Sequence, residues 1–244
     1  NWHNFVLWTL ANNYGGVANL ALIPGNMGAA PIQNIGAYGV ELKDSFVCCD
    51  AVEISTGALK RFTAKDCKFG YRESVFKNDL KGQYIITSVQ LQLQKPPHQL
   101  NTSYGRLEEA LQGTPPTIQN VANAVIAIQQ SKLPNPNEIG NCGSFFKNPI
   151  ISKQHYSRLV ENHPKLPQYT VDDVKVKVPA AWLIDTLGFK GYRKGDAGVH
   201  HSQPLVLVNH GNASGKELHA LSQEIKAAVA KTFAIHLEEE VNIY

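Results

Sequence analysis

The sequence has 244 residues, of which 43% are apolar and 18% are charged. A chain of this length can bury a large core and forms one large domain or two small ones. The 23 Lys and Arg against 20 Asp and Glu give a net charge of +3 without basic runs, which excludes a typical nucleic-acid-binding surface. No apolar run approaches the roughly 18 residues of a membrane-spanning helix, so we expect no membrane insertion.

The sequence opens inside an amphipathic helical pattern and has no initiating methionine. Trp2, Phe5, Val6 and Leu10 fall on one face, and Gly15-Gly16 ends the pattern. We therefore expect this chain to be a fragment of a longer protein.

A loop of small residues follows at 24–39 and includes four glycines. Successive backbone N–H groups in such a loop can form a concave nest for phosphate or pyrophosphate. The spacing is neither that of a Walker loop nor that of a dinucleotide-binding fingerprint. A phosphate site and a tight structural loop both remain open from spacing alone.

The next elements predict a small antiparallel sheet. Segments 46–55 and 59–63 flank Thr56-Gly57 and predict a hairpin. A further strand is expected over 83–94, with one apolar face formed by Ile85, Val89, Leu91 and Leu93.

Helices and prolines then organise the rest of the chain. Helices are predicted around 107–111 and from Thr117 to about 130, and Pro134 and Pro136 mark a domain boundary. Beyond it we predict helices from Ser152, over 179–187 and from Ser214, with strands over 205–208 and 235–244. This mixture without regular βαβ alternation predicts an α+β fold, with segments 1–133, 134–234 and a terminal strand at 235–244.

The cysteines and histidines predict no metal site. Cys48, Cys49, Cys67 and Cys142 lack CxxC spacing and are expected to be small buried side chains in a reducing compartment. A nucleophilic Cys142 is the weaker alternative, because nothing nearby would lower its pKa. His200-His201 would point to opposite sides of a strand, and no HExxH motif accompanies them.

Three further motifs have both structural and functional interpretations. Ser144 follows a glycine and can present its hydroxyl to a cleft, but no GxSxG elbow surrounds it. Arg72 follows an aromatic residue, as a surface arginine with a stacked stem often does. In 238–240, strand alternation would turn Glu239 away from the side shared by Glu238 and Glu240.

Taken together, six segments resemble the bacterial UDP-N-acetylenolpyruvoylglucosamine reductases, flavoenzymes that make UDP-N-acetylmuramate for peptidoglycan. The segments appear in family order and span nearly the whole chain. They are IPGNMGAAPIQNIGAYG (23–39), FGYRES (69–74), SKLPNP (131–136), GSFFKNP (143–149), AAWLID (180–185) and LEEEV (237–241).

The resemblance implies part of an FAD-binding domain of the vanillyl-alcohol-oxidase type over 1–133, with an inserted connector at about 98–133. An α+β substrate domain would follow. Matching positions imply three catalytic residues, Arg72, Ser144 and Glu240. Positions for substrate or NADPH are Tyr104, Lys132, Asn148, Tyr169 and Gln203. Positions for FAD are Gly25, Gly28, Ala29, Ala30, Pro31, Gln33, Asn34, Gly36 and Gly39.

Two departures from the family pattern accompany the resemblance. The family's N-terminal lobe and its Gly-Ser-Asn phosphate loop have no match here, and Gln129 stands where the family usually has an arginine. The segment holding Tyr104 looks like the longer of two family subtypes, in which a tyrosine folds over bound substrate.

The chemistry implied by the resemblance suits these residues. Hydride addition to the methylene carbon of an enolpyruvyl ether builds negative charge that a fixed cation, Arg72 or Lys132, would stabilise. Ser144 is a credible proton donor because an enolate-like acceptor is very basic. Glu240 would orient the proton donor or a substrate group, or assist the proton transfer.

We therefore expect a cytoplasmic, monomeric, FAD-dependent and NADPH-consuming reductase without a metal. Two alternatives remain open at this point. One is another FAD oxidoreductase of the same fold, and the other is a nucleotide-sugar-binding module without catalysis.

Overall fold

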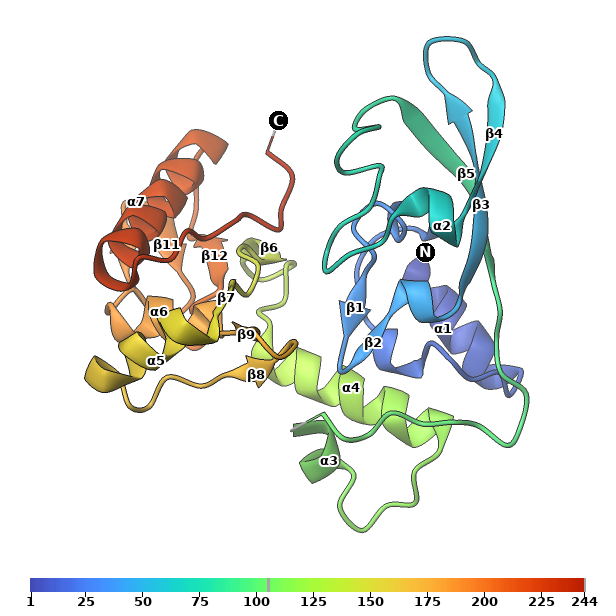
Figure 1. The fold of residues 1–244 in the computed structure, drawn as a ribbon, viewed down its shortest axis with the longest axis horizontal. Coiled ribbons are helices and arrows are strands. Elements are labelled where there is room, and N and C mark those ends of the chain that lie inside the picture. Colours follow the sequence, from blue (N-terminus) through green and yellow to red (C-terminus); the bar gives the residue numbers. More distant parts are fainter. Residues whose placement is uncertain (105, 244) are drawn as a thin grey trace. The chain divides into compact units, whose positions relative to one another are not determined.

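The computed structural model describes residues 1–104 and 106–243. Its helices and strands fall into two units (Figure 1). Unit 1 comprises Asn1–Gln129 and unit 2 comprises Gln130–Tyr244. Helix α4 (Ile118–Lys132) continues through this division. The division precedes the proline-based boundary by four residues and falls within the last turn of the helix.

Helix α1 (Trp2–Ala11) confirms the first predicted element. Its buried face includes Trp2, Val6 and Leu10, and the indole Nε1 of Trp2 donates to the carbonyl of Leu20 at 2.8 Å. This face packs into the core of unit 1, to which the buried face of α4 also contributes. The remaining helical turns of unit 1 are η1 (Ala18–Leu20), η2 (Met27–Ala29), η3 (Leu42–Asp44), α2 (Ala64–Cys67) and α3 (Arg106–Ala110).

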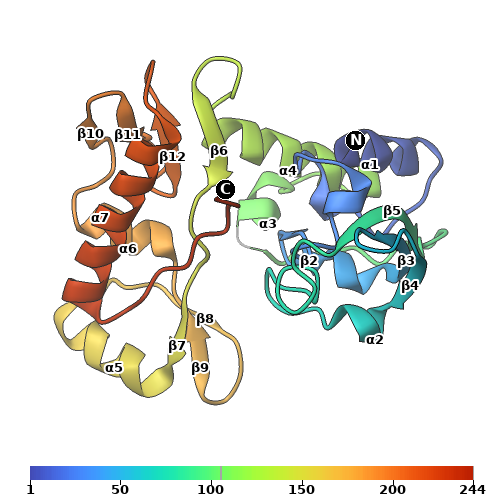
Figure 2. The same ribbon diagram turned by 90° about the horizontal axis from the view of Figure 1, so that it is seen from above.

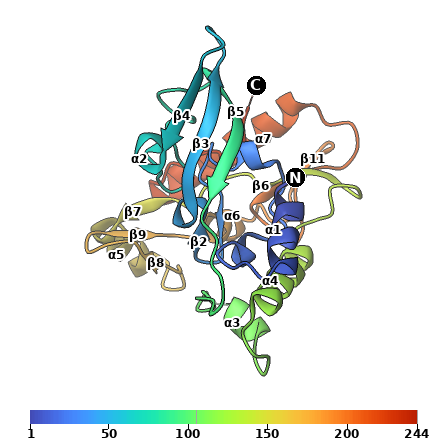
Figure 3. The same cartoon turned by 90° about the vertical axis from the view of Figure 1, so that its right-hand side faces the viewer.

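The predicted hairpin and third strand form an antiparallel sheet in the order β4-β3-β5 (Figure 3). Its strands are β3 (Phe46–Glu53), β4 (Leu59–Thr63) and β5 (Tyr84–Leu91). A separate two-stranded ribbon pairs β1 (Gly36–Ala37) with β2 (Val40–Glu41).

The prediction of which side chains form the apolar face of β5 is wrong at one end of the strand. Ile85 is 59% exposed, whereas Ile86 packs against the core together with Val89 and Leu91. The pairing moves from Asp50↔Ser88 to Ala51↔Ile86, so one extra residue, Thr87, is inserted. Such a β-bulge reverses which side chains face the core beyond it.

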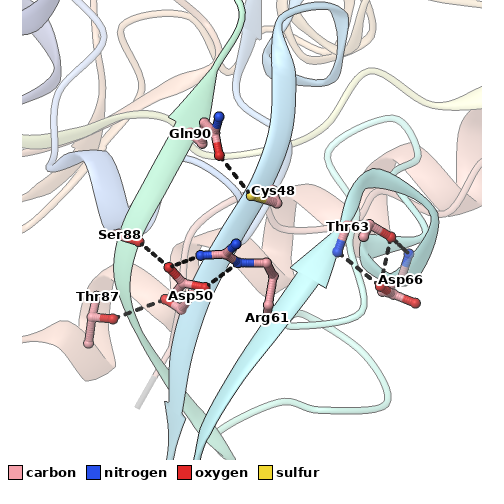
Figure 4. Close-up of polar contacts among 8 residues, drawn as sticks. All are labelled: Cys48, Asp50, Arg61, Thr63, Asp66, Thr87, Ser88 and Gln90. Atoms are coloured by element: carbon pink, nitrogen blue, oxygen red, sulfur yellow. Dashed lines mark hydrogen bonds and ion pairs between the residues drawn. The ribbon is translucent and has the colours of Figure 1, made fainter.

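Polar side chains hold this bulge on the outer face of the sheet (Figure 4). The Thr87 hydroxyl donates to the Asp50 carbonyl at 3.1 Å, and the Asp50 carboxylate accepts from Arg61 Nε at 2.7 Å and from Ser88 Oγ at 3.0 Å. The two hydrogen bonds to the carboxylate, first that from Arg61 and then that from Ser88, hold the pKa of Asp50 below its usual value. The bulge is thus stabilised by side chains from all three strands.

In the described part of unit 2, after the end of α4, two antiparallel sheets and three helices follow. Figure 2 shows these elements from above. The four-stranded sheet has the order β10-β11-β12-β6, and the three-stranded sheet has the order β7-β9-β8. The strands are β6 (Gly140–Ser144), β7 (Ile150–Ser152), β8 (Tyr169–Thr170), β9 (Lys175–Lys177), β10 (Arg193–Lys194), β11 (Ala197–Val199) and β12 (Val206–Asn209).

The helices of unit 2 confirm the predicted starts. They are α5 (Lys153–Asn162), α6 (Ala180–Thr186) and α7 (Gly215–Phe233). Ser214 and Glu217 form the predicted capping box at the start of α7. The buried stripe of α7 then packs against β11 and β12, so each unit has its own core and the α+β class is confirmed.

The terminal strand predicted over 235–244 is wrong. Through residue 243 the segment forms no strand and makes one isolated antiparallel bridge, Phe146↔Glu239; Tyr244 lies outside the described residues. Longer pairing is limited on one side because Pro149 has no N–H to continue a ladder, and on the other side the chain bends at residues 240–241.

Three of the four cysteines are buried as predicted, but Cys142 is exposed, so its predicted burial is wrong. Among the described residues, no helix combines the length and apolar character needed to cross a bilayer.

Candidate functional site

The glycine loop, defined as residues 24–39, is fastened to the segment 69–74 by three side-chain hydrogen bonds. Asn34 Nδ2 donates to the Gly70 carbonyl at 2.9 Å, and Ser74 Oγ donates to the Ile32 carbonyl at 2.6 Å. Arg72 Nη2 donates to the Gly36 carbonyl. Two segments that are far apart in sequence therefore form one rigid surface within unit 1.

Asn34 is the centre of this arrangement and is 0% exposed. Besides Gly70, its Nδ2 reaches the Glu41 carboxylate at 3.0 Å, and its Oδ1 accepts from the Lys43 N–H at 3.0 Å. These contacts use both ends of the amide. Asn34, expected from the resemblance to contact the cofactor, thus shapes the loop from inside.

Arg72 is held in an unusual conformation at the end of the loop. Its φ of +56° lies in the left-handed region, which non-glycine residues rarely adopt. Its guanidinium lies 5.2 Å from the Tyr71 ring, and a Cβ at Gly36 would lie 2.8 Å from Arg72 Nη1. A side chain at position 36 would therefore displace the guanidinium from its place against the loop.

The other expected cofactor residues differ in exposure. Ala30 and Pro31 are buried, like Asn34, and Gly28, Gln33 and Gly36 are half-buried. Gly25, Ala29 and Gly39 are exposed. The buried members determine the shape of the loop, and the exposed backbone is the part that a ligand can approach.

Tyr104 and Gln129 lie at the edges of this region. The Tyr104 ring is 43% exposed and contacts the Tyr38 ring edge-to-face at 5.8 Å. Burial, together with the neighbouring Tyr104, raises the pKa of Tyr38 to about 12. Gln129 Nε2 donates to the Ala21 carbonyl at 2.9 Å, so it ties α4 to the chain just before the glycine loop.

In unit 2, a β-bulge sets the direction of the Ser144 side chain. Ser144 pairs with Val206, but the next aligned pair is Asn141↔Val208, which leaves Cys142 and Gly143 opposite a single residue. Gly143 has a φ of +72°, and its N–H donates to Asn141 Oδ1 at 3.0 Å. Bulges of this kind re-aim side chains near active sites, and here the exposed Ser144 follows the bulge directly.

Glu240 lies beside the same strand end. Its N–H donates to the Phe145 carbonyl at 2.8 Å, and the Lys147 N–H donates to the Glu238 carbonyl at 2.9 Å. The structure therefore brings the backbones of Ser144 and Glu240 together within unit 2, as the resemblance implies for two catalytic positions.

The two acidic residues before Glu240 form ion pairs with different lysines. Glu238 pairs with the buried Lys147 at 3.0 Å, and Glu239 pairs with Lys226 of α7 at 2.7 Å. Burial by itself would raise the pKa of Glu239, but the hydrogen bonds and charge of Lys226 outweigh it and hold that pKa below its usual value. These pairs fix the segment that carries Glu240.

The expected substrate residues are spread over unit 2, apart from Tyr104 in unit 1. Gln203 is close to Ser144 along the sheet, because its carbonyl accepts from the N–H of Val206. Asn148 Oδ1 accepts from the Ala180 N–H at 2.9 Å and so caps α6, which leaves its Nδ2 end for a ligand. Lys132 is half-buried at the end of α4, and Tyr169 is exposed in β8.

Two groups of polar side chains were not predicted from the sequence. Asn19 is buried and bonds two distant carbonyls, and no local pattern marks it. His200, His201 and His210 line a cavity of about 380 Å³, with the first two rings 4.2 Å apart. The predicted opposite orientation of His200 and His201 is wrong because β11 ends at Val199. Among the described residues, neither these three histidines nor any other group of His, Cys, Asp and Glu is arranged to hold a metal ion.

We predict that acid loosens the segment 235–243. Because the pKa of Glu239 is lowered in the folded state, its stabilising contribution is complete above its ordinary value of 4.5 and is lost as the pH falls below that value. The protection factors of this segment, which are its hydrogen-exchange rates corrected for the intrinsic rate at each pH, should therefore fall as the pH is lowered through the ordinary value of 4.5.

In Glu239→Gln the protection factors of the segment should be low both above and below pH 4.5. Asp185→Asn removes an exposed ion pair with Lys190 in the same unit and should leave the acid response unchanged. An unchanged acid response in Glu239→Gln would contradict the assignment.

Comparisons with known proteins identify the family of this chain. The family model for the C-terminal domain of UDP-N-acetylenolpyruvoylglucosamine reductase matches residues 135–244. The enzyme of that name from Flavobacterium johnsoniae is 55% identical over 245 residues, which are 99% of this chain and 73% of the relative. The one from Amoebophilus asiaticus is 51% identical over 246 residues, covering 100% of this chain and 72% of the relative.

A solved structure shares the fold at lower identity. The UDP-N-acetylenolpyruvylglucosamine reductase of Thermus caldophilus matches with a TM-score of 0.67 and 23% identity, over 99% of this chain and 68% of that protein. With relatives this similar over its whole length, the chain belongs to the UDP-N-acetylenolpyruvoylglucosamine reductase family.

Proposed function

We propose that this chain carries out the NADPH-dependent reduction of UDP-N-acetylglucosamine enolpyruvate to UDP-N-acetylmuramate with FAD, in peptidoglycan precursor synthesis. The observation that carries the proposal is the fixed Arg72 guanidinium, hydrogen-bonded to the Gly36 carbonyl of the glycine loop. Family membership supports the activity, and the cytoplasmic location expected from the sequence is part of the proposal.

The residues of unit 1 fit a flavin dinucleotide. The glycine loop offers exposed backbone at Gly25, Ala29 and Gly39, while Asn34 and Ser74 fix its shape from the buried side. Backbone N–H groups and a guanidinium are the donors that suit pyrophosphate and other anionic groups. We propose that the glycine loop and Arg72 hold FAD, which when bound carries hydride from NADPH to the methylene carbon of the enolpyruvyl group.

Arg72 would act by its fixed charge. Reduction of an enolpyruvyl ether places negative charge on the carbon next to the carboxylate and on the carboxylate itself. A cation that is already in place stabilises that charge more than it stabilises the uncharged double bond. The contacts to Gly36 and Tyr71 hold the guanidinium without further rearrangement.

Ser144 and Glu240 would complete the reaction. The Ser144 hydroxyl would donate a proton to the basic carbon, which requires an exposed hydroxyl in a fixed orientation, and the bulge at Gly143 provides the orientation. Glu240 would orient the proton donor or a substrate group. Lys132, Asn148, Tyr169, Gln203 and Tyr104 are the proposed contacts of the sugar nucleotide or NADPH.

The direct test supplies FAD, NADPH and the enolpyruvyl sugar nucleotide to the purified protein. We expect the loss of NADPH absorbance to require both FAD and the sugar nucleotide, with one UDP-N-acetylmuramate formed per NADPH. Equal NADPH oxidation without the sugar nucleotide would favour another FAD oxidoreductase. Binding of the sugar nucleotide without turnover would favour a binding module.

We predict that Ser144→Ala separates the two half-reactions. Reduction by NADPH needs no proton on the sugar and should stay close to the parent rate. Reduction of the sugar nucleotide should slow by more than about 100-fold, the lower range for a positioned acid. Stopped-flow flavin absorbance without oxygen measures both steps on one sample.

Two further variants sharpen this test. Ser144→Cys should recover part of the rate, because a thiol is a stronger acid of similar size. Ser157→Ala removes an exposed hydroxyl on α5 and should change neither step. Equal slowing of both steps in Ser144→Ala would mean that Ser144 maintains the site and does not donate the proton.

We predict that Gly143→Ala reduces activity through the bulge. Its φ of +72° strains an alanine by about 1–2 kcal/mol, although no other atom lies within 4 Å of the added Cβ. Gly188→Ala, at a φ of +78° with equally open space, provides the matched control. Thermal unfolding should show similar losses in both variants, whereas only Gly143→Ala should lower the rate of sugar-nucleotide reduction. Equal rates in the two variants would contradict a role for the bulge.

A further inference from the structure

A cavity of about 490 Å³ in unit 1 is lined mostly by polar side chains. These side chains bond mainly to the protein itself: Ser45 Oγ donates to the Gly16 carbonyl at 3.3 Å, and Gln94 Oε1 accepts from the Gln99 N–H at 3.2 Å. The polar lining therefore connects chain segments across the cavity. Asn19 is the most buried polar side chain of that lining and makes the longest of these connections.

Asn19 joins two segments that are distant in sequence. It is 5% exposed, and its Nδ2 donates to the Tyr38 carbonyl at 2.9 Å and to the Asn101 carbonyl at 2.8 Å. A side-chain NH₂ group has two hydrogens, so one amide satisfies both carbonyls. Tyr38 lies at the tip of the β1–β2 ribbon in the glycine loop, and Asn101 lies in the connector that leads to Tyr104.

Further contacts reinforce the same junction. Asn101 Nδ2 donates to the Gly39 carbonyl at 3.0 Å, and a Cβ at Gly39 would lie 2.9 Å from that nitrogen. The Tyr38 and Tyr104 rings meet edge-to-face three residues further along the connector. We call this set of contacts between 38–39 and 101–104 the ribbon–connector junction.

We propose that Asn19 is a positioning residue that holds the connector, and with it Tyr104, against the tip of the glycine loop. Its effect on catalysis is therefore indirect and appears in the binding of the sugar nucleotide; this part of the inference rests on the proposed function. Asn19 itself touches neither the reacting atoms nor the cofactor in this account.

The chemistry of the site requires an amide at position 19. Aspartate has the same shape but would place an oxygen against two carbonyl oxygens, which removes both hydrogen bonds and adds repulsion. Alanine would leave two buried carbonyls without their donor. Both substitutions should open the ribbon–connector junction, and Asn19→Asp should open it more.

The first measurement is independent of activity. Loss of two hydrogen bonds should raise the local opening equilibrium of the junction by about 30-fold. In Asn19→Ala, we expect faster hydrogen exchange over 38–41 and 101–104 and faster trypsin cleavage after Arg106 by that factor. Exchange in α7 should remain unchanged.

The matched control is Thr9→Val. Thr9 is 0% exposed, and its hydroxyl donates to the Val6 carbonyl at 2.7 Å inside α1 of the same unit. This variant also loses a buried hydrogen bond and should lower the melting temperature comparably. It should leave exchange at the ribbon–connector junction at the parent rate.

The second measurement separates positioning from general damage. Asn19→Ala should raise the KM for the sugar nucleotide at least fivefold while kcat, measured at saturating FAD, stays within twofold. If Asn19 acts through Tyr104, the KM of Asn19→Ala/Tyr104→Ala should not exceed that of Tyr104→Ala alone.

The outcomes decide each part separately. Parent-like exchange at the junction in Asn19→Ala would overturn the structural role whether or not the protein is a reductase. Additive KM effects in the double variant would overturn action through Tyr104. If the parent protein lacks reductase activity, the proposed function fails, and the exchange data still decide whether Asn19 holds the junction.

Discussion

The buried amide of Asn34 is the contact on which the site in unit 1 depends. A fully buried amide must satisfy its donors and its acceptor inside the protein, and Asn34 does so with Gly70, Glu41 and the Lys43 N–H. These partners come from the residues directly after the glycine loop and from the segment that carries Arg72. Because a single side chain joins them, the loop and the guanidinium keep a defined relation within the unit.

Unit 2 obtains its geometry from an irregular strand. The bulge at Gly143 lets β6 change the direction of its side chains before Ser144, and the segment 237–240 then lies beside the residues that follow. A regular strand would place consecutive side chains on opposite faces. The local departure from regular pairing is thus what presents Ser144 at the strand end next to Glu240. Lysines on two sides hold the acidic segment, so its position depends on charge as well as on pairing.

The sequence predicted most elements correctly because their signals are local. The capping box of Ser214, the Ser152 N-cap and the apolar stripe of α4 involve residues within one or two turns of each other. The errors arose where distant contacts intervene. Ile85 faces outward because Thr87 is inserted into the pairing of β5 with β3, and the segment 235–243 forms no strand because Pro149, with no N–H, ends the pairing around Phe146.

For the candidate site, the sequence by itself determined which residue types are present and in what order, and that was enough to indicate the family. Only the tertiary structure decided what each residue does for the fold. Asn34 and Asn148 belong to motifs of the family, yet their amides stabilise the glycine loop and cap α6. Asn19 lies outside the six segments that resemble the family, but its amide joins the carbonyls of Tyr38 and Asn101. The physical reason is that a side-chain amide has the same hydrogen-bonding groups wherever it occurs, and only the folded chain determines which partners come within about 3 Å of them.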